Sequence, residues 1–206
     1  MARRHPTRAD NLRRALAQEA ARIMAEHGIG DFRVAKLKAA ERFGVGDGAA
    51  LLPKNSEIEA ALAEYQRLFG GSSHQSALAA QRRAALTAMR CLLEFTPRLV
   101  GPVLTGTATA HSQVQLHLFA DRAESVTLRL MDLSIAHEVT ERRVRLDAER
   151  VRPFPGVRFA VDDHSIEATV FPADGIRQAP VSPVDGRPMR RANAFEVEAL
   201  LAETLG

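Results

Sequence analysis

Apolar residues in the first half of the chain recur at steps of three and four, the spacing of one face of an α-helix. Leu12, Leu16, Ala20 and Ile23 follow this spacing and predict a first helix that stops at His27-Gly28. Further helices of this half are predicted over residues 32–43, 56–69 and 74–95, followed by the Gly-rich stretch 44–48, by Gly70-Gly71 and by Thr96-Pro97 respectively. Ser56 and Glu59 have the spacing of a capping box at the start of the third helix.

After residue 97 the period of the apolar positions changes to two, which is typical of half-buried strands. Strands are predicted near 99–105, 113–120, 138–146, 157–162 and 165–171, with a helix near 122–134, a loop over 177–188 and a closing amphipathic helix over 194–205. The pattern therefore predicts an α+β fold, in which an N-terminal helical region (1–96) is followed by a mixed β-sheet flanked by helices (97–206).

Composition agrees with a globular chain that buries a sizeable core: 206 residues, 46% hydrophobic and 26% charged. The single cysteine, Cys91, excludes an intramolecular disulfide and a cysteine-based zinc cage, and its helical context predicts a buried thiol. No apolar run is long enough for a membrane span and no secretory leader is recognised, so we expect no membrane partner and a cytoplasmic location.

The formal net charge is +3, and the excess is concentrated near the N-terminus. This arginine arm comprises Arg3, Arg4, Arg8, Arg13 and Arg14. Such an arm could follow a phosphate backbone, but only 5% of the residues are aromatic and no stacking series lies within it. A solvated helix start is the competing interpretation, and nucleic acid is the partner expected if the arm binds a phosphate backbone.

Two short segments of the second half stand out, a Gly-Pro pair and a pair of glutamines separated by one residue. Gly101-Pro102 follows an apolar residue, and Gln113 and Gln115 follow on the next predicted strand with one apolar residue between them. This arrangement resembles the nucleotidyltransferase superfamily, whose palm is of the DNA polymerase beta type. In that family Gly-Ser stands where Gly101-Pro102 stands, and two Asp stand where the Gln pair stands.

The residues around these segments extend the resemblance to a small bacterial subfamily. The matching positions are Thr105, Gly106, Ser112, His117, Phe119 and Asp121. Further along, the segment from Ile166 to Pro172 resembles the strand that carries the family's third carboxylate, here Glu167, which we expect two strands away from the Gln pair. Asp185-Gly186-Arg187-Pro188 resembles a loop that follows it.

The resemblance implies that Gln113, Gln115 and Glu167 occupy the catalytic positions. In an active transferase two Mg²⁺ ions neutralise the attacking and leaving oxygens, and Mg²⁺ prefers anionic oxygen ligands. Glu167 alone remains as a metal ligand, so Mg²⁺ would be the cofactor only of an active form. The nucleotide-binding positions implied by the family are Gly101, Pro102, Thr105, Gly106, His111 and Ser112.

A purely structural interpretation competes with this one. Val114, Leu116 and Leu118 alternate with polar residues as in any half-buried strand, so the Gln side chains would simply face water. His111, His117 and Asp121 could be drawn as a metal cluster, but their setting favours surface positions or, for His111, a phosphate contact.

Three functions are therefore expected as alternatives. The first is a nucleotidyltransferase-fold protein whose metal-dependent transfer is impaired or lost and which still binds a nucleoside triphosphate or a protein partner. The second is an active transferase with an atypical site, which moves a nucleotidyl group to a small molecule or a protein. The third is a nucleic-acid or protein interaction module that uses the basic N-terminal helices.

Overall fold

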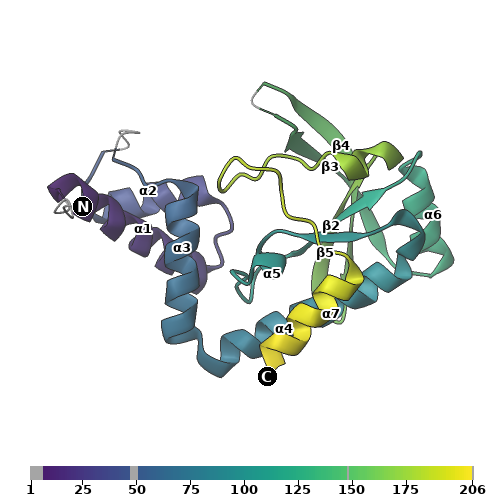
Figure 1. Ribbon diagram of the computed structural model, residues 1–206, viewed down its shortest axis with the longest axis horizontal. Coiled ribbons are helices and arrows are strands. Elements are labelled where there is room, and N and C mark those ends of the chain that lie inside the picture. The colour runs from purple at the N-terminus through teal and green to yellow at the C-terminus, as the bar shows by residue number, and fades with distance from the viewer. Residues whose placement is uncertain (1–6, 47–50, 148, 206) are drawn as a thin grey trace, which may run out of the picture. The chain divides into compact units, whose positions relative to one another are not determined.

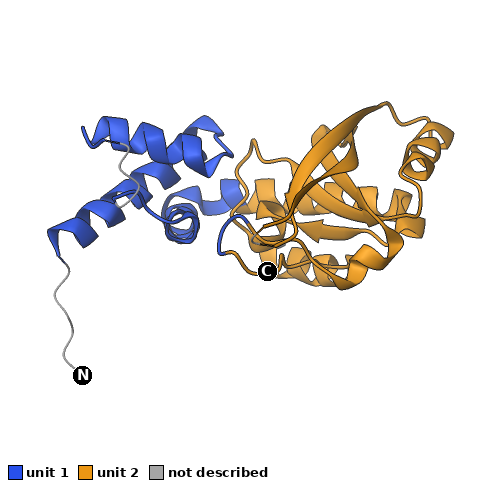
Figure 2. Cartoon of the chain, turned by 90° about the horizontal axis from the view of Figure 1, so that it is seen from above, with its two compact units in different colours: residues 1–74, 183–185 blue, residues 75–182, 186–206 orange. Residues whose placement is uncertain are grey.

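A computed structural model describes residues 7–46, 51–147 and 149–205. The chain divides into two compact units, one made of residues 1–74 and 183–185 and the other of residues 75–182 and 186–206 (Figure 2). Two separate hydrophobic cores account for this division, because one contains only residues of the first helices and the other joins the sheet to its helices.

The first unit is built on three helices, α1 (Arg8–His27), α2 (Phe32–Arg42) and α3 (Asn55–Tyr65), with a π-helical turn at Gln66–Gly70 (Figure 1). Its core is rich in alanine, including Ala20 and Ala39, so the helices approach closely. Thr7 caps α1 by accepting a hydrogen bond from the Asp10 amide, and Gly28 ends the helix in the left-handed conformation.

The second unit contains the sheet and its helices (Figure 1). In chain order its elements are α4 (Gly71–Cys91), the 3-10 turn Leu93–Phe95, β1 (Arg98–Val100), α5 (Pro102–Thr105), β2 (Val114–Phe119), α6 (Glu124–Asp132), β3 (His137–Arg145), β4 (Val151–Val161), β5 (His164–Phe171), the 3-10 turn Ala173–Arg177, here called η3, and α7 (Ala194–Leu205). The α+β fold predicted from the sequence is confirmed.

The sheet has five strands in the order β1-β2-β5-β4-β3. Strands β2 and β5 are parallel, and the other neighbours are antiparallel. Strand β4 is longer than predicted because its first half contains Pro153 and Pro155, which weaken a strand signal. This half pairs with β3, whereas the pairing of β4 with β5 covers Gly156 to Val161, so the prolines disturb only one ladder.

One face of the sheet is apolar and covered by helices. Leu116 of β2 and Ala168 of β5 lie in one core with Met89 of α4, Leu130 of α6 and Val197 of α7. Helices α4 and α7 run side by side (Figure 1) and are joined by an ion pair between Arg90 and Glu198. This explains why α4 belongs mainly to the sheet unit, which begins at Gln75, although we expected the helical region to continue to residue 96.

Two local predictions are wrong. The strand predicted over 99–105 ends at Val100, because Gly101 has φ +72° and Pro102 starts the short helix α5. The predicted capping pair of Ser56 and Glu59 does not start α3. The helix begins at Asn55, where Glu57 accepts a hydrogen bond from the Lys54 amide at 2.6 Å.

Two further predictions agree in part. Cys91 is half-buried rather than buried. Helices end near residues 27 and 42 as predicted, although residues 47 and 48 of the glycine-rich stretch lie outside the described residues. Within the described part of the chain, no helix has the length and apolar character needed to cross a membrane.

Candidate functional site: the polar face of the sheet

The face of the sheet opposite the helical core carries polar and charged side chains, and we call it the polar face. The strand register places Gln115 and His117 of β2, Glu167 and Thr169 of β5, and Arg142 and Arg158 of β3 and β4 on it. Successive strand residues point to opposite faces, so the alternation of the sequence separates these residues from the apolar core. The predicted catalytic positions 115 and 167 therefore share one face.

Gln115 and Glu167 lie directly opposite each other in the register of the parallel strands β2 and β5. We expected two strands of separation, and this expectation is wrong because β5 is the immediate neighbour of β2. The side chain of Gln115 also lies against the turn at Gly101, where a Cβ atom would come within 2.6 Å of Gln115 Oε1. The structure thus brings Gly101, Gln115 and Glu167 together, whereas Gln113 lies just before β2.

Glu167 is held in a buried ion-pair cluster. Its side chain is only 7% exposed and pairs with Arg142 Nη1 and, at 3.8 Å, with Arg158 Nη2. Arg158 also donates to Glu138 at 3.2 Å. A buried carboxylate between two guanidiniums is already neutralised, and these guanidiniums would repel a cation placed beside it.

The residues on the polar face therefore do not form a cage for Mg²⁺. Gln113 and Gln115 are uncharged, and Glu167 is engaged by two arginines. Within the described ranges, no group of three or more His, Cys, Asp or Glu side chains is placed to hold a metal ion. The alternative drawn from His111, His117 and Asp121 is thus not formed.

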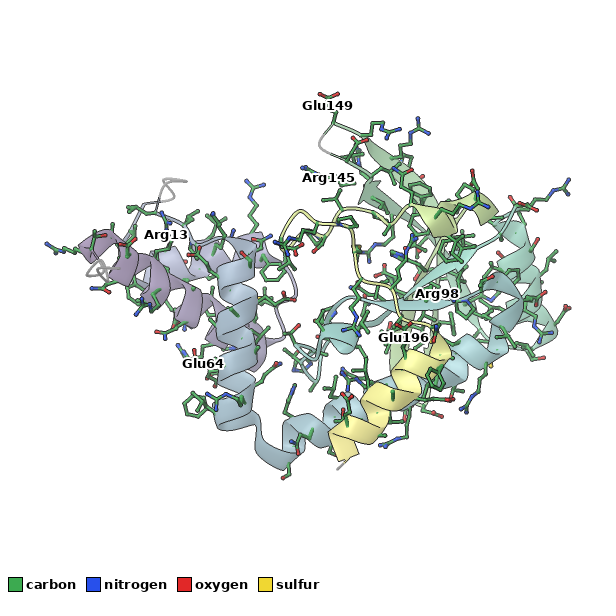
Figure 3. All side chains as sticks on the ribbon, viewed as in Figure 1. Arg13, Glu64, Arg98, Arg145, Glu149 and Glu196 are labelled. Atoms are coloured by element: carbon green, nitrogen blue, oxygen red, sulfur yellow. The ribbon has the colours of Figure 1, made fainter. Side chains whose placement is uncertain are left out.

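The polar face is strongly basic. Strand register puts Arg98, Arg142, Arg152 and Arg158 on it, and Arg191 reaches it from the segment before α7; the carboxylates that the same register places there are Glu138 and Glu167. Figure 3 labels Arg98 at the start of β1. An excess of guanidinium groups favours an anionic ligand over a divalent cation.

His117 is buried on this face, so our expectation of a surface histidine is wrong. It is 6% exposed, and its Nδ1 accepts a hydrogen bond from Arg191 Nε at 3.1 Å. Burial, together with the nearby Arg191 and Arg142 charges, lowers the pKa of His117 to about 3. The ring is therefore neutral at physiological pH, with its proton on Nε2.

Arg191 fastens the segment before α7 to the sheet. Its guanidinium lies 4.9 Å from the centre of the Phe119 ring and 5.3 Å from that of Phe171. Nη1 donates to the carbonyls of Gly175 and Ile176 at 3.0 and 3.2 Å. Burial and the nearby Arg98 lower the pKa of Arg191 to about 10, so it stays charged at neutral pH.

The segment around Arg191 is also bonded to the edge of the sheet. The backbones of Leu99 and Ala192 exchange two hydrogen bonds, of 2.8 and 2.9 Å. Sequence reasoning did not single out Arg142, Arg158 or Arg191, because their contacts join strands and loops that are distant along the chain. The only signal in the sequence was the placement of Arg142 and Arg158 in predicted strand regions.

The predicted nucleotide-binding residues between β1 and β2 form a compact turn. Pro102 occupies the first position of α5, and Gly106 ends that helix with φ +84°. The Thr105 hydroxyl bonds the Thr107 hydroxyl at 2.9 Å. The glycine and the two hydroxyl groups thus stabilise the end of this four-residue helix. The nucleotide-binding role of these residues stays a prediction.

The second half of this connection is a turn that α4 holds in place. The Ser112 hydroxyl accepts from the Thr109 amide at 2.9 Å, and the exposed His111 donates its amide to the Thr109 hydroxyl. Gln81 of α4 donates to the carbonyls of Thr109 and Ser112. The Ser112 hydroxyl therefore has a structural role in the turn.

Arg82 of α4 anchors α5 from the apolar side. It is 5% exposed and donates to the Val103 carbonyl at 3.2 Å and to the Leu200 carbonyl at 2.7 Å. Because one guanidinium joins α4, α5 and α7, the turn at Gly101 is held at a fixed place beside β2.

A cavity of about 620 Å³ lies at the carboxyl end of β2, away from Gln115. Its lining includes Phe119, Asp121, Arg122 and Ile176 but none of the predicted catalytic positions. The basic residues of the polar face, rather than this cavity, therefore define the candidate site.

Comparison with known proteins adds no assignment to this geometry. The sequence matches no protein-family model, and a search of curated proteins found no match.

Proposed function

We propose that this chain is a nucleotidyltransferase-like palm protein that binds a nucleotide through the polar face and has lost metal-dependent transfer. The observation that carries the proposal is the pairing of Glu167 with Arg142 and Arg158, directly opposite Gln115. At the positions where the family has three carboxylates for Mg²⁺, this chain has two amides and one neutralised carboxylate. Guanidiniums beside them supply the charge that phosphate needs.

We expect this arrangement to bind a polyphosphate without transferring a phosphoryl or nucleotidyl group. Arginine presents planar pairs of N–H donors that match phosphate oxygens, and it stays charged at all physiological pH values. It cannot activate an attacking hydroxyl as a metal or a general base does. We therefore assign the polar face the recognition of a polyphosphate and no group transfer.

Isothermal titration with ATP, GTP, CTP and UTP, each with and without Mg²⁺, tests the proposal. We expect binding that Mg²⁺ leaves unchanged or weakens, because the metal neutralises phosphate charge that the arginines would otherwise contact. Adenosine is the matched control without phosphate and is expected not to bind. Binding that Mg²⁺ tightens tenfold would instead support an active transferase with an atypical site, and no binding of any triphosphate would refute the proposal.

A second candidate function rests on helix α2 of the first unit. This helix has one acidic residue, Glu41, and four basic residues, Arg33, Lys36, Lys38 and Arg42. Its buried side consists of alanines, whereas Val34 and Leu37 are each 40% exposed. A helix that buries its smallest residues and exposes larger apolar ones among cations favours an interaction surface.

Salt-dependent binding of a DNA or RNA oligonucleotide tests the nucleic-acid form of this second function. Reversal of two charges in Arg33→Glu/Lys38→Glu is expected to abolish such binding, because both side chains are exposed on α2. Both substitutions lie in the first unit, so the fold of the sheet unit is expected to be unchanged. Nucleotide binding by the polar face is therefore expected to persist in this variant.

A further inference from the structure

The guanidiniums of Arg142 and Arg158 lie between a buried carboxylate and solvent. Their side chains are 40% and 43% exposed, whereas that of Glu167 is 7% exposed. Each guanidinium has five N–H donors, and a single carboxylate cannot use all the donors of two. The two arginines therefore have N–H donors left for solvent, while the ion pairs with the buried Glu167 hold their guanidiniums in place.

The two carboxylates that pair with these arginines differ in how deeply they are buried. Glu167 is held inside the sheet face, but Glu138, which accepts from Arg158 at 3.2 Å, is 67% exposed. An exposed ion pair contributes little to stability and exchanges readily with other anions. Arg152 adds a further cation on the same face, since it pairs with Val144 of β3, which lies two residues from Arg142.

We propose that Arg142 and Arg158 form a phosphate subsite, in which Glu167 orients the guanidiniums and also acts as an internal competing anion. This inference rests on the proposed function and adds the place where the polyphosphate binds. A phosphate oxygen pair would take the outward donors and displace Glu138 at the solvent edge. Glu167 would stay in place and weaken the attraction by its negative charge.

The competing role of Glu167 gives a prediction that a structural role does not. Glu167→Gln keeps the size of the side chain and removes its charge, so phosphate is expected to bind about tenfold more tightly. Arg142→Ala removes a phosphate donor and is expected to weaken binding by about tenfold. If Glu167 served only to hold the fold together, its loss would weaken binding.

Titration of the full chain with inorganic tripolyphosphate and with ATP, both without Mg²⁺, is the experiment. Arg143→Ala is the matched control, because Arg143 is exposed on the opposite face of the same strand. We expect tighter binding in Glu167→Gln, weaker binding in Arg142→Ala and no change in Arg143→Ala. If Arg142→Ala and Arg143→Ala lost affinity for tripolyphosphate equally, the attraction would be nonspecific and the subsite would be overturned.

A second substitution and a thermal melting curve distinguish a variant that misfolds from one that folds but has lost the subsite. Arg142→Lys keeps one charge but loses the paired donors, and it is expected to bind tripolyphosphate more weakly than the parent while unfolding at a similar temperature. Unchanged binding in folded Arg142→Lys and Arg142→Ala would overturn the subsite.

The outcomes also separate this inference from the proposed function. If ATP binds and none of the substitutions at 142 and 167 changes its affinity, the subsite is wrong and nucleotide binding stands. If tripolyphosphate follows the expected pattern but ATP and the other nucleotides do not bind, the subsite stands and the nucleotide function fails. If neither ligand binds the parent or Glu167→Gln, both are refuted.

Discussion

Arg191 Nε donates a hydrogen bond of 3.1 Å to Nδ1 of His117, although the two residues are 74 positions apart in the sequence. The contact fixes a buried neutral imidazole under a cation that is itself stacked on Phe119 and Phe171. Protonation of His117 would put two positive charges in contact. This pair therefore couples the acid stability of the protein to the packing of the segment before α7 against the polar face.

Acid is expected to destabilise the protein through His117. The folded pKa of about 3 lies below the ordinary value of 6.5, so the unfolded chain binds a proton that the folded chain does not. The stabilising contribution is thus complete above pH 6.5 and is lost as the pH falls toward 3. Between pH 7 and 5 the free energy of unfolding is expected to fall by about 2 kcal/mol from this residue alone. Urea unfolding at several pH values measures it.

Two substitutions control this pH experiment. His117→Gln is expected to remove most of the slope between pH 7 and 5, whereas His111→Gln, at an exposed position, is expected to retain it. A slope that persists unchanged in His117→Gln would show that other groups titrate in this range.

Substitution of Arg191 is expected to loosen the segment before α7. Arg191→Ala removes the bonds to His117 and to two carbonyls together with the ring stacking, which should lower the free energy of unfolding by about 2 kcal/mol. Arg191→Lys is expected to recover less than half of the loss, since lysine lacks the planar fork. Thermal unfolding and amide exchange of residues 186–193 provide the measurements, and the exposed Arg190→Ala should leave both unchanged.

Gly101 and Gln115 are expected to show coupled effects on stability. Gly101 has φ +72°, and a Cβ there would meet Gln115 Oε1 at 2.6 Å. Gly101→Ala is expected to cost about 2 kcal/mol, part from the positive-φ backbone, which side chains other than glycine rarely adopt, and part from displacement of Gln115. In a Gln115→Ala background only the backbone part should remain, and a double-mutant cycle measures the difference. Strictly additive effects would contradict the contact.

Aspartates placed at positions 113 and 115, where the nucleotidyltransferase pattern has them, are expected to weaken anion binding rather than create a metal site. Gln115→Asp adds a negative charge opposite Glu167, which Arg142 and Arg158 contact, and Gln113→Asp adds a second just before the same strand, so Mg²⁺-free binding of ATP should fall by about tenfold or more. Gln113→Asn/Gln115→Asn is the neutral control and should bind nearly as the parent does. Strong Mg²⁺-dependent binding in the aspartate variant would indicate that the arginines do not prevent a metal site.

The local elements and the separation of the two sheet faces follow from the order of residues alone. Periodicity identified α1, α2, α7 and the order of helices and strands in the second half, because a helix face and a strand face each repeat within a few residues. It also placed Gln115 and Glu167 at the polar positions of their strands. It failed where a single backbone conformation decided the outcome, as at Gly101, which ends β1 early.

The neighbouring strands and the charged groups that contact one another are set by the three-dimensional fold. The parallel pairing of β2 with β5 sets Gln115 opposite Glu167, and the hairpin of β3 and β4 brings Arg142 and Arg158 to that carboxylate. The same long-range packing buries His117 under Arg191. Local periodicity carries no information on such partners, because the contact energies depend on groups that the chain brings together only when the sheet forms.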